Sequence, residues 1–363
     1  MNLLHVNSEK SWRGGEQQLA YLIQNLKELK PELTQAVASA PNPKLKAFCK
    51  AESVPFFEIP FKGAQFISAY KLWSLTRSHP FDLIHCHSSN AHTACALMSL
   101  INSKTPLVIS KRTDFPIKSP WKYRLKSVKA ILCVSKKIEQ IVKTKIEGPT
   151  KTIYSGVNSD RFHRLPKKDL KGLLGLSKNI RLVINTSAMA PHKDYPTFLK
   201  TAQKLKEKSP HFKFAIIGRG PLETQIKAMT EEMGLSDTVF FTGFLEELPQ
   251  YLASADYFLM TSNEEGLGTS LLDAMVCKVP IVATEAGGIP EIVKNLETGL
   301  TASVGDSAEL SKNLERFESD SKLRDEIVER AYNMATNNFS SLQTAKETLL
   351  VYQSIINGDA CVF

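Results

Sequence analysis

Short apolar runs alternate with helical stretches along almost the whole chain of 363 residues. Strands that alternate with helices are typical of a parallel sheet covered by helices on both faces, so the predicted fold class is α/β. Helices are expected at Ile67–Arg77 and Lys136–Lys145, among others. The buried strands predicted for the first half are Leu3–Val6, Thr34–Ala38, Asp82–Cys86, Pro106–Ile109 and Ala130–Val134.

The second half repeats this alternation. A polar segment over residues 155–168 separates the halves, so we expect two doubly wound domains, 1–160 and 161–340, followed by a helix over Ser341–Ile356. Ligands of open parallel sheets bind outside the carboxyl ends of the strands, so residues directly after strands are the first site candidates. The strands predicted here are Arg181–Asn185, Lys213–Ile217, Val239–Thr242, Tyr257–Met260 and Val279–Ala283.

Positive charge is concentrated in the first half of the chain. The net charge is +9, and residues 1–160 hold 23 basic and 11 acidic side chains, whereas residues 161–363 hold 23 and 26. This asymmetry predicts an anionic partner for the first half: nucleic acid, a phosphorylated substrate or a membrane surface.

Several features argue against export and against a membrane span. The apolar stretch at the N-terminus is too short for a signal-peptide core. The longest apolar run near the middle, 94–101, is less than half of the roughly 20 residues that a spanning helix needs. The six cysteines include no Cys-x-x-Cys pair and are expected to be reduced, mostly buried thiols. We expect a cytoplasmic protein.

The strongest motif follows the predicted strand Tyr257–Met260. Glu265 precedes two glycines at the start of a predicted helix, and Asp273 lies eight positions later, about two helical turns away. Glycines permit close backbone approach, and free N–H groups at a helix start hold phosphates or hydroxyls. Two carboxylates on one side of the element would accept hydrogen bonds from two hydroxyl-bearing parts of a ligand. Alternatively, Glu265 favours the helix dipole and Asp273 is a solvated helix residue.

These residues resemble a known signature. The run Glu265–Asp273, with Pro280, Gly287–Gly288 and Glu291, is similar to the donor site of GT-B glycosyltransferases, and more narrowly of the retaining glycosyltransferase family 4. The chain departs from that pattern at Asp273, where the family has Glu, and at Ala188, where it has Arg. Further matching segments span nearly the whole chain in order: Arg13–Glu16, Tyr154–Asn158, Pro191–Asp194, Gly218–Pro221 and Val239–Gly243.

The resemblance implies a GT-B fold, with two Rossmann-like domains facing across a cleft and the helix 341–357 packing back on the first, acceptor-side domain. It implies a retaining, metal-independent hexosyltransferase that uses a nucleotide diphosphate sugar, UDP-sugar favoured, as co-substrate and needs no cofactor. The expected acceptor is a cell-envelope glycoconjugate, either lipid-linked or a lipopolysaccharide core. A nucleotide-sugar 2-epimerase on the same fold and a non-catalytic nucleotide-sugar-binding scaffold are the alternatives.

The resemblance also implies residue roles. Lys193 would pair with the diphosphate, Glu265 would accept from sugar hydroxyls, and Asp273 would hold the ribose. Arg112 stands near the place where many relatives carry a histidine, and it would stabilise the diphosphate or an acidic acceptor. The expected donor-binding residues are Gly14, Gly15, Arg219, Phe244, Gly266, Leu267, Gly268, Thr269 and Asp273.

Histidines mark the end of the predicted strand Asp82–Cys86. His85 and His87 are two apart and so share one side of the strand. We expect His85 to be a buried, hydrogen-bonded residue and His87 to act at the catalytic site. A metal site formed with His92 is a weak alternative, because the set has no Cys or carboxylate partner, so we expect no metal.

A basic segment covers Lys111–Lys129, with seven basic residues, the single acid Asp114 and interleaved aromatics. Basic residues mixed with aromatics suit an anionic membrane interface. The resemblance favours the inner face of the membrane over nucleic acid, for which no recognition fold is evident; a solvated basic face is the other alternative. The residues expected to meet an acceptor or membrane are Lys118, Lys122, Arg124 and Lys126.

Overall fold

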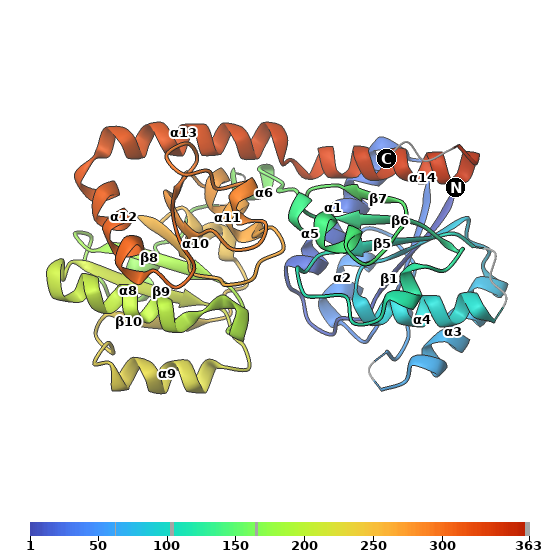
Figure 1. The fold of residues 1–363 in the computed structure, drawn as a ribbon, viewed down its shortest axis with the longest axis horizontal. Helices are drawn as coiled ribbons and strands as arrows, with labels where there is room; N and C mark the ends of the chain where they lie inside the picture. Colours follow the sequence, from blue (N-terminus) through green and yellow to red (C-terminus); the bar gives the residue numbers. More distant parts are fainter. Residues whose placement is uncertain (62, 102–104, 164–165, 360–363) are drawn as a thin grey trace. The chain divides into compact units, whose positions relative to one another are not determined.

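The computed structural model describes residues 1–61, 63–101, 105–163 and 166–359 (Figure 1). The chain forms two compact units. Unit 1 contains Met1–Gly156 and the chain from Ser341 on, and unit 2 is Val157–Ser340. The division therefore lies four residues before the predicted one at 160, and the last helix belongs with the first unit.

Unit 1 is built on a seven-stranded parallel sheet with the order β3-β2-β1-β4-β5-β6-β7. The strand order reverses between β1 and β4, and such a switch point is where doubly wound sheets bind ligands. Parallel strands with helices on both faces are buried throughout, which explains their almost continuous apolar sequences. The strands are β1 (Asn2–Asn7), β2 (Thr34–Ser39), β3 (Phe56–Glu58), β4 (Leu83–Cys86), β5 (Leu107–Lys111), β6 (Val128–Cys133) and β7 (Thr150–Thr152).

Helices cover both faces of this sheet. The final helix, α14, packs on α1, and its Tyr352 is fully buried in the same core as Leu3 and Leu132. The helices are α1 (Gly14–Leu29), α2 (Pro43–Ala51), α3 (Gln65–Ser78), α4 (Ser89–Leu100), α5 (Lys136–Lys143) and α14 (Ser341–Asn357), with a short 3₁₀ turn at Pro120–Tyr123. Figure 1 shows α14 along one side of unit 1 and α3 and α4 along the opposite side.

Unit 2 has a six-stranded parallel sheet with the order β10-β9-β8-β11-β12-β13, which reverses between β8 and β11. Its strands are β8 (Arg181–Thr186), β9 (Phe212–Ile217), β10 (Val239–Gly243), β11 (Tyr257–Met260), β12 (Ile281–Thr284) and β13 (Leu300–Ala302). Its helices are α6 (Asp160–His163), α7 (Leu170–Leu173), α8 (Tyr195–Lys208), α9 (Glu223–Glu232), α10 (Leu248–Leu252), α11 (Thr269–Val276), α12 (Ser307–Ser319) and α13 (Ser321–Asn338), with 3₁₀ turns at Pro191–Lys193 and Ile289–Glu291.

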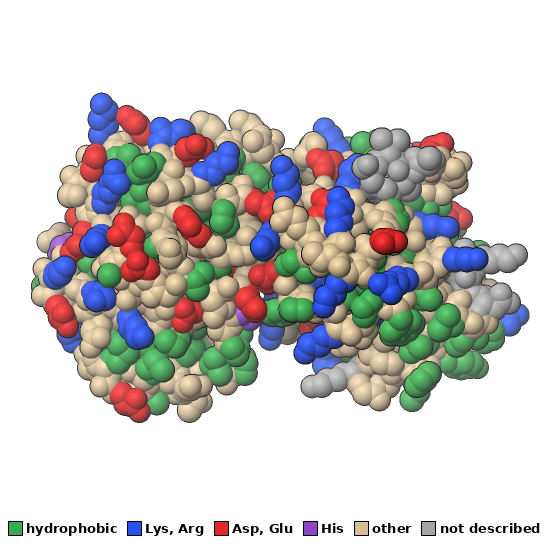
Figure 2. Space-filling model, viewed as in Figure 1, with side chains coloured by type: hydrophobic (Ala, Val, Ile, Leu, Met, Phe, Trp, Pro, Cys, Tyr) green, Lys and Arg blue, Asp and Glu red, His purple; other side chains and the backbone are tan. Residues whose placement is uncertain are grey.

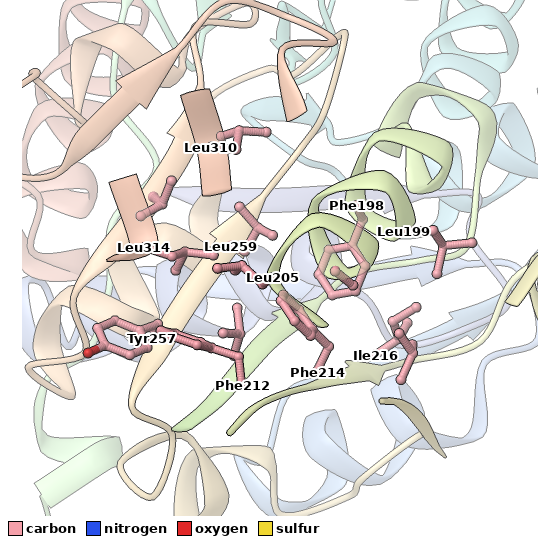
Figure 3. Packing of buried hydrophobic residues seen from close by; sticks show 14 of the residues in the cluster. Phe198, Leu199, Leu205, Phe212, Phe214, Ile216, Tyr257, Leu259, Leu310 and Leu314 are labelled. Atoms are coloured by element: carbon pink, nitrogen blue, oxygen red, sulfur yellow. The ribbon is translucent and has the colours of Figure 1, made fainter. Parts of the chain in front are cut away.

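An aromatic core fixes the helices of unit 2 to its sheet (Figure 3). Phe198 of α8 meets Phe214 of β9 edge to face, with ring centroids 5.6 Å apart. Tyr257 of β11 stacks on Phe317 of α12 with centroids 6.4 Å apart. Aromatic pairs of this kind stabilise a core beyond the area that they bury. The sheet is thereby a rigid support for the loops at its carboxyl edge.

The predicted strands agree with the structure to within two residues at each end. Three edge strands, β3, β7 and β13, were missed because three residues are too few for a hydrophobic pattern to show. Cys49, Cys86, Cys95 and Cys133 are buried free thiols, as expected. Among the described residues, no helix has the length and apolarity needed to cross a bilayer.

Candidate functional site

Three loops of unit 2 are joined at the carboxyl edge of its sheet. The amide of Asn263, after β11, donates to the carbonyl of His192, after β8, at 3.0 Å. The amide of Gly288, after β12, donates to the carbonyl of Glu265 at 2.9 Å. Backbone bonds between loops fix their relative positions without using side chains, so polar side chains remain available for a ligand.

Lys193 and Glu265 form an ion pair at this edge, and only 14% and 15% of their side chains are exposed. Lys193 ends a 3₁₀ turn, and Asp194, with a left-handed φ of 46°, begins α8 directly after it. The hydroxyl of Thr261 donates to the carbonyls of both residues at 3.1 Å. A cation and a carboxylate are thus held together on fixed backbone, next to the candidate phosphate-binding helix start of α11.

The glycines of Gly218-x-Gly220 allow two loops to touch. A Cβ on Gly218 would lie 2.3 Å from the carbonyl oxygen of Ser187, and one on Gly220 would lie 2.4 Å from that of Met189. The loop after β9 therefore rests directly on the loop after β8. Arg219, between the two glycines, is exposed and its guanidinium lies against Gly243.

We expect Gly220→Ala to lower the stability of unit 2, because the new methyl group would overlap backbone atoms that cannot yield. Overpacking of this kind costs about 1–3 kcal/mol, or roughly 2–12 °C in Tm for a unit of this size. Gly15→Ala is the matched control, because a Cβ there meets nothing within 4 Å and alanine favours the helix. Thermal unfolding followed by circular dichroism measures both, and equal Tm values for the two variants would contradict the packing argument.

Gly268 opens α11 in a left-handed conformation, with φ of 89°. Gly266, Leu267 and Gly268 are buried, and the side chain of Leu267 is only 2% exposed, so this segment offers its backbone rather than its side chains. Helix α11 starts at Thr269. Glu265 therefore lies in the loop before the helix and Asp273 lies within the helix, as predicted.

Asp273 lies in α11 and is half-buried. Burial raises its pKa to about 7, and the positive charge of Arg161 opposes this shift. Because the folded-state pKa is above the ordinary value, its stability contribution is complete below about pH 4 and is lost as the pH rises through about 7.

We therefore expect Asp273→Asn to raise the stability of the protein at pH 8 and to leave it unchanged near pH 4. The gain at pH 8 is on the order of 2–4 kcal/mol, because the amide carries no charge that burial penalises. Thermal unfolding of both proteins at the two pH values measures the difference in stability between variant and wild type. The effects of the other carboxylates are the same in both proteins and cancel in this difference. A variant that follows the wild-type pH profile throughout would show that Asp273 ionises normally.

Three buried histidines meet in unit 1. His5 comes from β1, and His85 and His87 come from the end of β4, with ring centroids of the latter two 4.0 Å apart. Their nitrogens lie within 4.8 Å of one another. The prediction that His85 and His87 share one side is confirmed. The predicted third member, His92, lies elsewhere: its Nε2 and the carbonyl of Lys122 are 3.0 Å apart.

A hydrogen-bond chain leads from Arg112 through these histidines into α1. Arg112 Nη2 donates to His87 Nδ1 at 3.3 Å, so the proton of His87 is on Nε2, which donates to His5 Nδ1 at 3.0 Å. His5 Nε2 then donates to Gln35 Oε1 at 3.1 Å, and Gln35 donates to the carbonyl of Ile23. Burial lowers the pKa of His5 to about 4 and that of His87 well below its usual value, so both rings are neutral.

Arg112 remains the charged member of this cluster. Burial lowers its pKa to about 10, so it is protonated at neutral pH. His85 is held separately, by Ser110 Oγ at 2.8 Å and by the hydroxyl of Tyr352. An arginine oriented by neutral imidazoles is a fixed cation next to the switch point of the sheet, and it is suited to a carboxylate or phosphate.

The basic segment 111–129 is not one face. Lys122 is 5% exposed and donates to Thr93 Oγ1 at 2.9 Å and to Ser89 O at 3.1 Å, so it anchors its loop to α4. Lys111 is also buried and donates to the carbonyl of Phe115 at 3.1 Å. The prediction that Lys122 meets an acceptor or membrane is wrong, because its ammonium group is already satisfied within the unit. Lys118, Arg124 and Lys126 are exposed.

The glycine pair after β1 forms the first turn of α1. Glu16 closes this turn by accepting from the backbone N–H of Arg13 at 2.9 Å and from the Asn7 side chain at 3.1 Å. Burial raises the pKa of Glu16 above its ordinary value. Gly14 is exposed, and the space beside Gly15 is open, so a ligand has room to approach the backbone here.

Comparison with known proteins connects both edges to one family. The model of glycosyltransferase family 4 matches residues 12–161, and the model of glycosyl transferases group 1 matches residues 167–334. The chain belongs to the glycosyltransferase group 1 family. The first match begins beside the glycine turn of α1, and the second contains the Lys193–Glu265 pair and Asp273, so both candidate edges lie inside the matched regions.

Relatives of this glycosyltransferase act on varied acceptors, as their names state. The N-acetyl-alpha-D-glucosaminyl L-malate synthase of Bacillus anthracis is 22% identical over 80% of this chain and 79% of its own length. The GDP-mannose-dependent alpha-(1-6)-phosphatidylinositol monomannoside mannosyltransferase of Mycolicibacterium smegmatis is 32% identical over 42% of this chain and 45% of its own. The HepE structure of Anabaena with UDP-glucose is 21% identical, covers 98% of this chain and all of that one, and has a TM-score of 0.83. This structural likeness confirms the predicted GT-B fold of two Rossmann-like domains.

The glycosyltransferase also contains site residues that the sequence did not single out. His5 and Gln35 orient His87. Tyr352, near the end of the chain, forms a hydrogen bond with His85, and the positive charge of Arg161 lowers the pKa of Asp273. One signal for His5 was present, because a histidine inside an otherwise apolar strand needs a buried partner. No sequence pattern connects Tyr352 to His85, since 267 positions separate them.

Proposed function

We propose that this glycosyltransferase transfers a hexose-type sugar from a UDP-sugar to a lipid-linked or lipopolysaccharide-core acceptor, with retention of configuration and without a metal. Relatives with envelope-related names support the acceptor class, among them the lipopolysaccharide core biosynthesis glycosyltransferase LpsE of Rhizobium meliloti, which is 24% identical over 44% of this chain. The structural likeness to HepE with bound UDP-glucose supports the donor class.

The observation that carries this proposal is the Lys193–Glu265 pair at the carboxyl edge of β8 and β11. In the proposed complex, Lys193 turns to the diphosphate and stabilises the charge that develops on it as the sugar leaves. Glu265, released from Lys193, accepts hydrogen bonds from sugar hydroxyls. Asp273 accepts from the ribose hydroxyls, and Arg219 with the backbone of Gly266–Thr269 adds positive potential for the phosphates.

The proposal assigns the acceptor to unit 1. Arg112 stabilises an anionic group there, and His87 keeps its guanidinium in place. Retention follows a same-face displacement, in which the C–O bond to the diphosphate breaks, the acceptor oxygen bonds to the anomeric carbon on the same face, and the leaving phosphate takes the acceptor proton. Cationic side chains and backbone N–H groups then do the work that a metal would otherwise do.

Incubation of the protein with a panel of nucleotide sugars tests this proposal. A transferase slowly hydrolyses its donor to nucleoside diphosphate and free sugar, and NMR of the first sugar anomer formed reports retention. Turnover that persists in excess chelator supports metal independence. Formation of an epimeric nucleotide sugar would identify a 2-epimerase instead, and binding without turnover in the presence of membrane extract would identify a scaffold.

A further inference from the structure

Helix α3 of unit 1 exposes large apolar side chains in its first two turns. Phe66 is 79% exposed, Tyr70 is 61% exposed and Ile67 is 56% exposed. These values are high for side chains whose burial would be favourable by about 1.5–3 kcal/mol each. Figure 2 shows hydrophobic side chains gathered on unit 1 over the region where Figure 1 labels α3 and α4.

Three aromatic residues and an arginine form a stripe along the helix, in which Trp73 is partly buried and the others are exposed. Phe66, Tyr70, Trp73 and Arg77 follow one another at spacings of four, three and four residues, which is one face of an α-helix. The rings of Tyr70 and Trp73 are 5.7 Å apart, and the guanidinium of Arg77 lies 5.0 Å from the Trp73 ring. The opposite face, which contains Ser68, Ala69 and Leu72, is buried. One face of the helix therefore packs against unit 1, and a second apolar face is covered by no described residue.

Two cations lie on this helix. Lys71 and Arg77 are exposed, and α3 contains no acidic residue. Aromatic side chains flanked by long cationic ones are the composition of helices that lie at the surface of an anionic bilayer, where the rings enter the headgroup region and the cations reach the phosphates.

We propose that α3 is a membrane-docking helix, which lies on an anionic lipid surface with Phe66, Ile67 and Tyr70 inserted among the headgroups. A bilayer fits this face better than a protein groove does, because the stripe lies along the outside of the helix and carries its cations beside it. This inference goes beyond the proposed reaction and needs neither donor nor acceptor. It also moves the expected contact from the basic segment 111–129 to a helix that the charge pattern did not single out.

Sedimentation with lipid vesicles tests the docking helix. We expect the full chain to bind vesicles that contain phosphatidylglycerol and to bind phosphatidylcholine vesicles much more weakly. The triple variant Phe66→Ser, Ile67→Ser and Tyr70→Ser should lower the partition coefficient about a hundredfold, because three inserted apolar side chains are lost. The variant Lys71→Gln with Arg77→Gln should lower binding to the anionic vesicles roughly thirtyfold and change binding to neutral ones little.

Leu350→Ser is the matched control, since Leu350 is 61% exposed on α14, along the opposite side of unit 1. It should bind vesicles as the wild type does. Circular dichroism establishes that each variant is folded, and donor hydrolysis without lipid should be the same in all of them. Unchanged vesicle binding by the triple variant would overturn the proposal. So would sedimentation-velocity evidence that the stripe joins two copies of the chain and that the triple variant is monomeric.

Discussion

Lys193→Ala is expected to lower kcat/KM for nucleotide-sugar turnover by about a thousandfold, with the fold intact. One electrostatic donor aimed at developing charge contributes roughly a hundred- to thousandfold, and the variant also leaves Glu265 without its cation in a mostly buried position. Steady-state release of nucleoside diphosphate measures the effect.

Lys206→Ala is the control for this variant. Lys206 also forms an ion pair in unit 2, with Asp237 at 2.6 Å, but both side chains are at the surface, where such a pair contributes little. Turnover by this control should equal that of the wild type. Equal turnover by Lys193→Ala would place the donor diphosphate elsewhere in the protein.

The second large effect is expected for Glu265→Gln. The amide has nearly the same shape as the carboxylate but lacks its charge, so it binds sugar hydroxyls less strongly and leaves Lys193 with a neutral partner. We expect kcat to fall about a hundredfold, with a smaller change in KM, because hydrogen bonds to an ionised acceptor are roughly twice as strong as neutral ones. Product formation at saturating donor separates the two constants.

Combining the two substitutions provides the sharper experiment. Because Lys193 and Glu265 touch, their effects should not add, and the double variant should be little slower than Lys193→Ala alone. Glu297→Gln serves as the control, since Glu297 forms a surface ion pair with Lys294 at 3.8 Å in the loop that precedes β13. Additive losses in the double variant would show that the Lys193–Glu265 ion pair does not form in the free protein.

The neutral histidines of unit 1 give a physical reason for an arginine at position 112. A cation beside protonated imidazoles would be destabilised, but burial keeps His5 and His87 unprotonated, so His87 accepts a hydrogen bond from the guanidinium.

The order of strands and helices was predictable because each element carries its own pattern. Buried parallel strands are apolar throughout, and strands such as Tyr257–Met260 matched the structure at both ends. The glycine loops were equally predictable. Where two loops touch, as Gly220 touches Met189, there is no room for a Cβ, so the position requires glycine.

The basic segment shows where such reasoning fails. Lys111, Lys122 and Lys126 look alike in sequence, yet the first two are buried and bonded within unit 1 and only the third is exposed. Charge counts record which side chains are cationic but not which carbonyls lie within reach of them.

The sequence by itself determined the fold class, the family and the loops that follow the strands. These depend on local periodicity and on glycines at positions where a Cβ would overlap neighbouring backbone. The tertiary structure alone decided which distant side chains act together: Lys193 with Glu265, Arg112 with His87 and His5, and Tyr352 with His85. The reason is that a parallel sheet orders its strands differently in space and in sequence, so neighbours such as β1 and β4 meet across about 80 residues of chain.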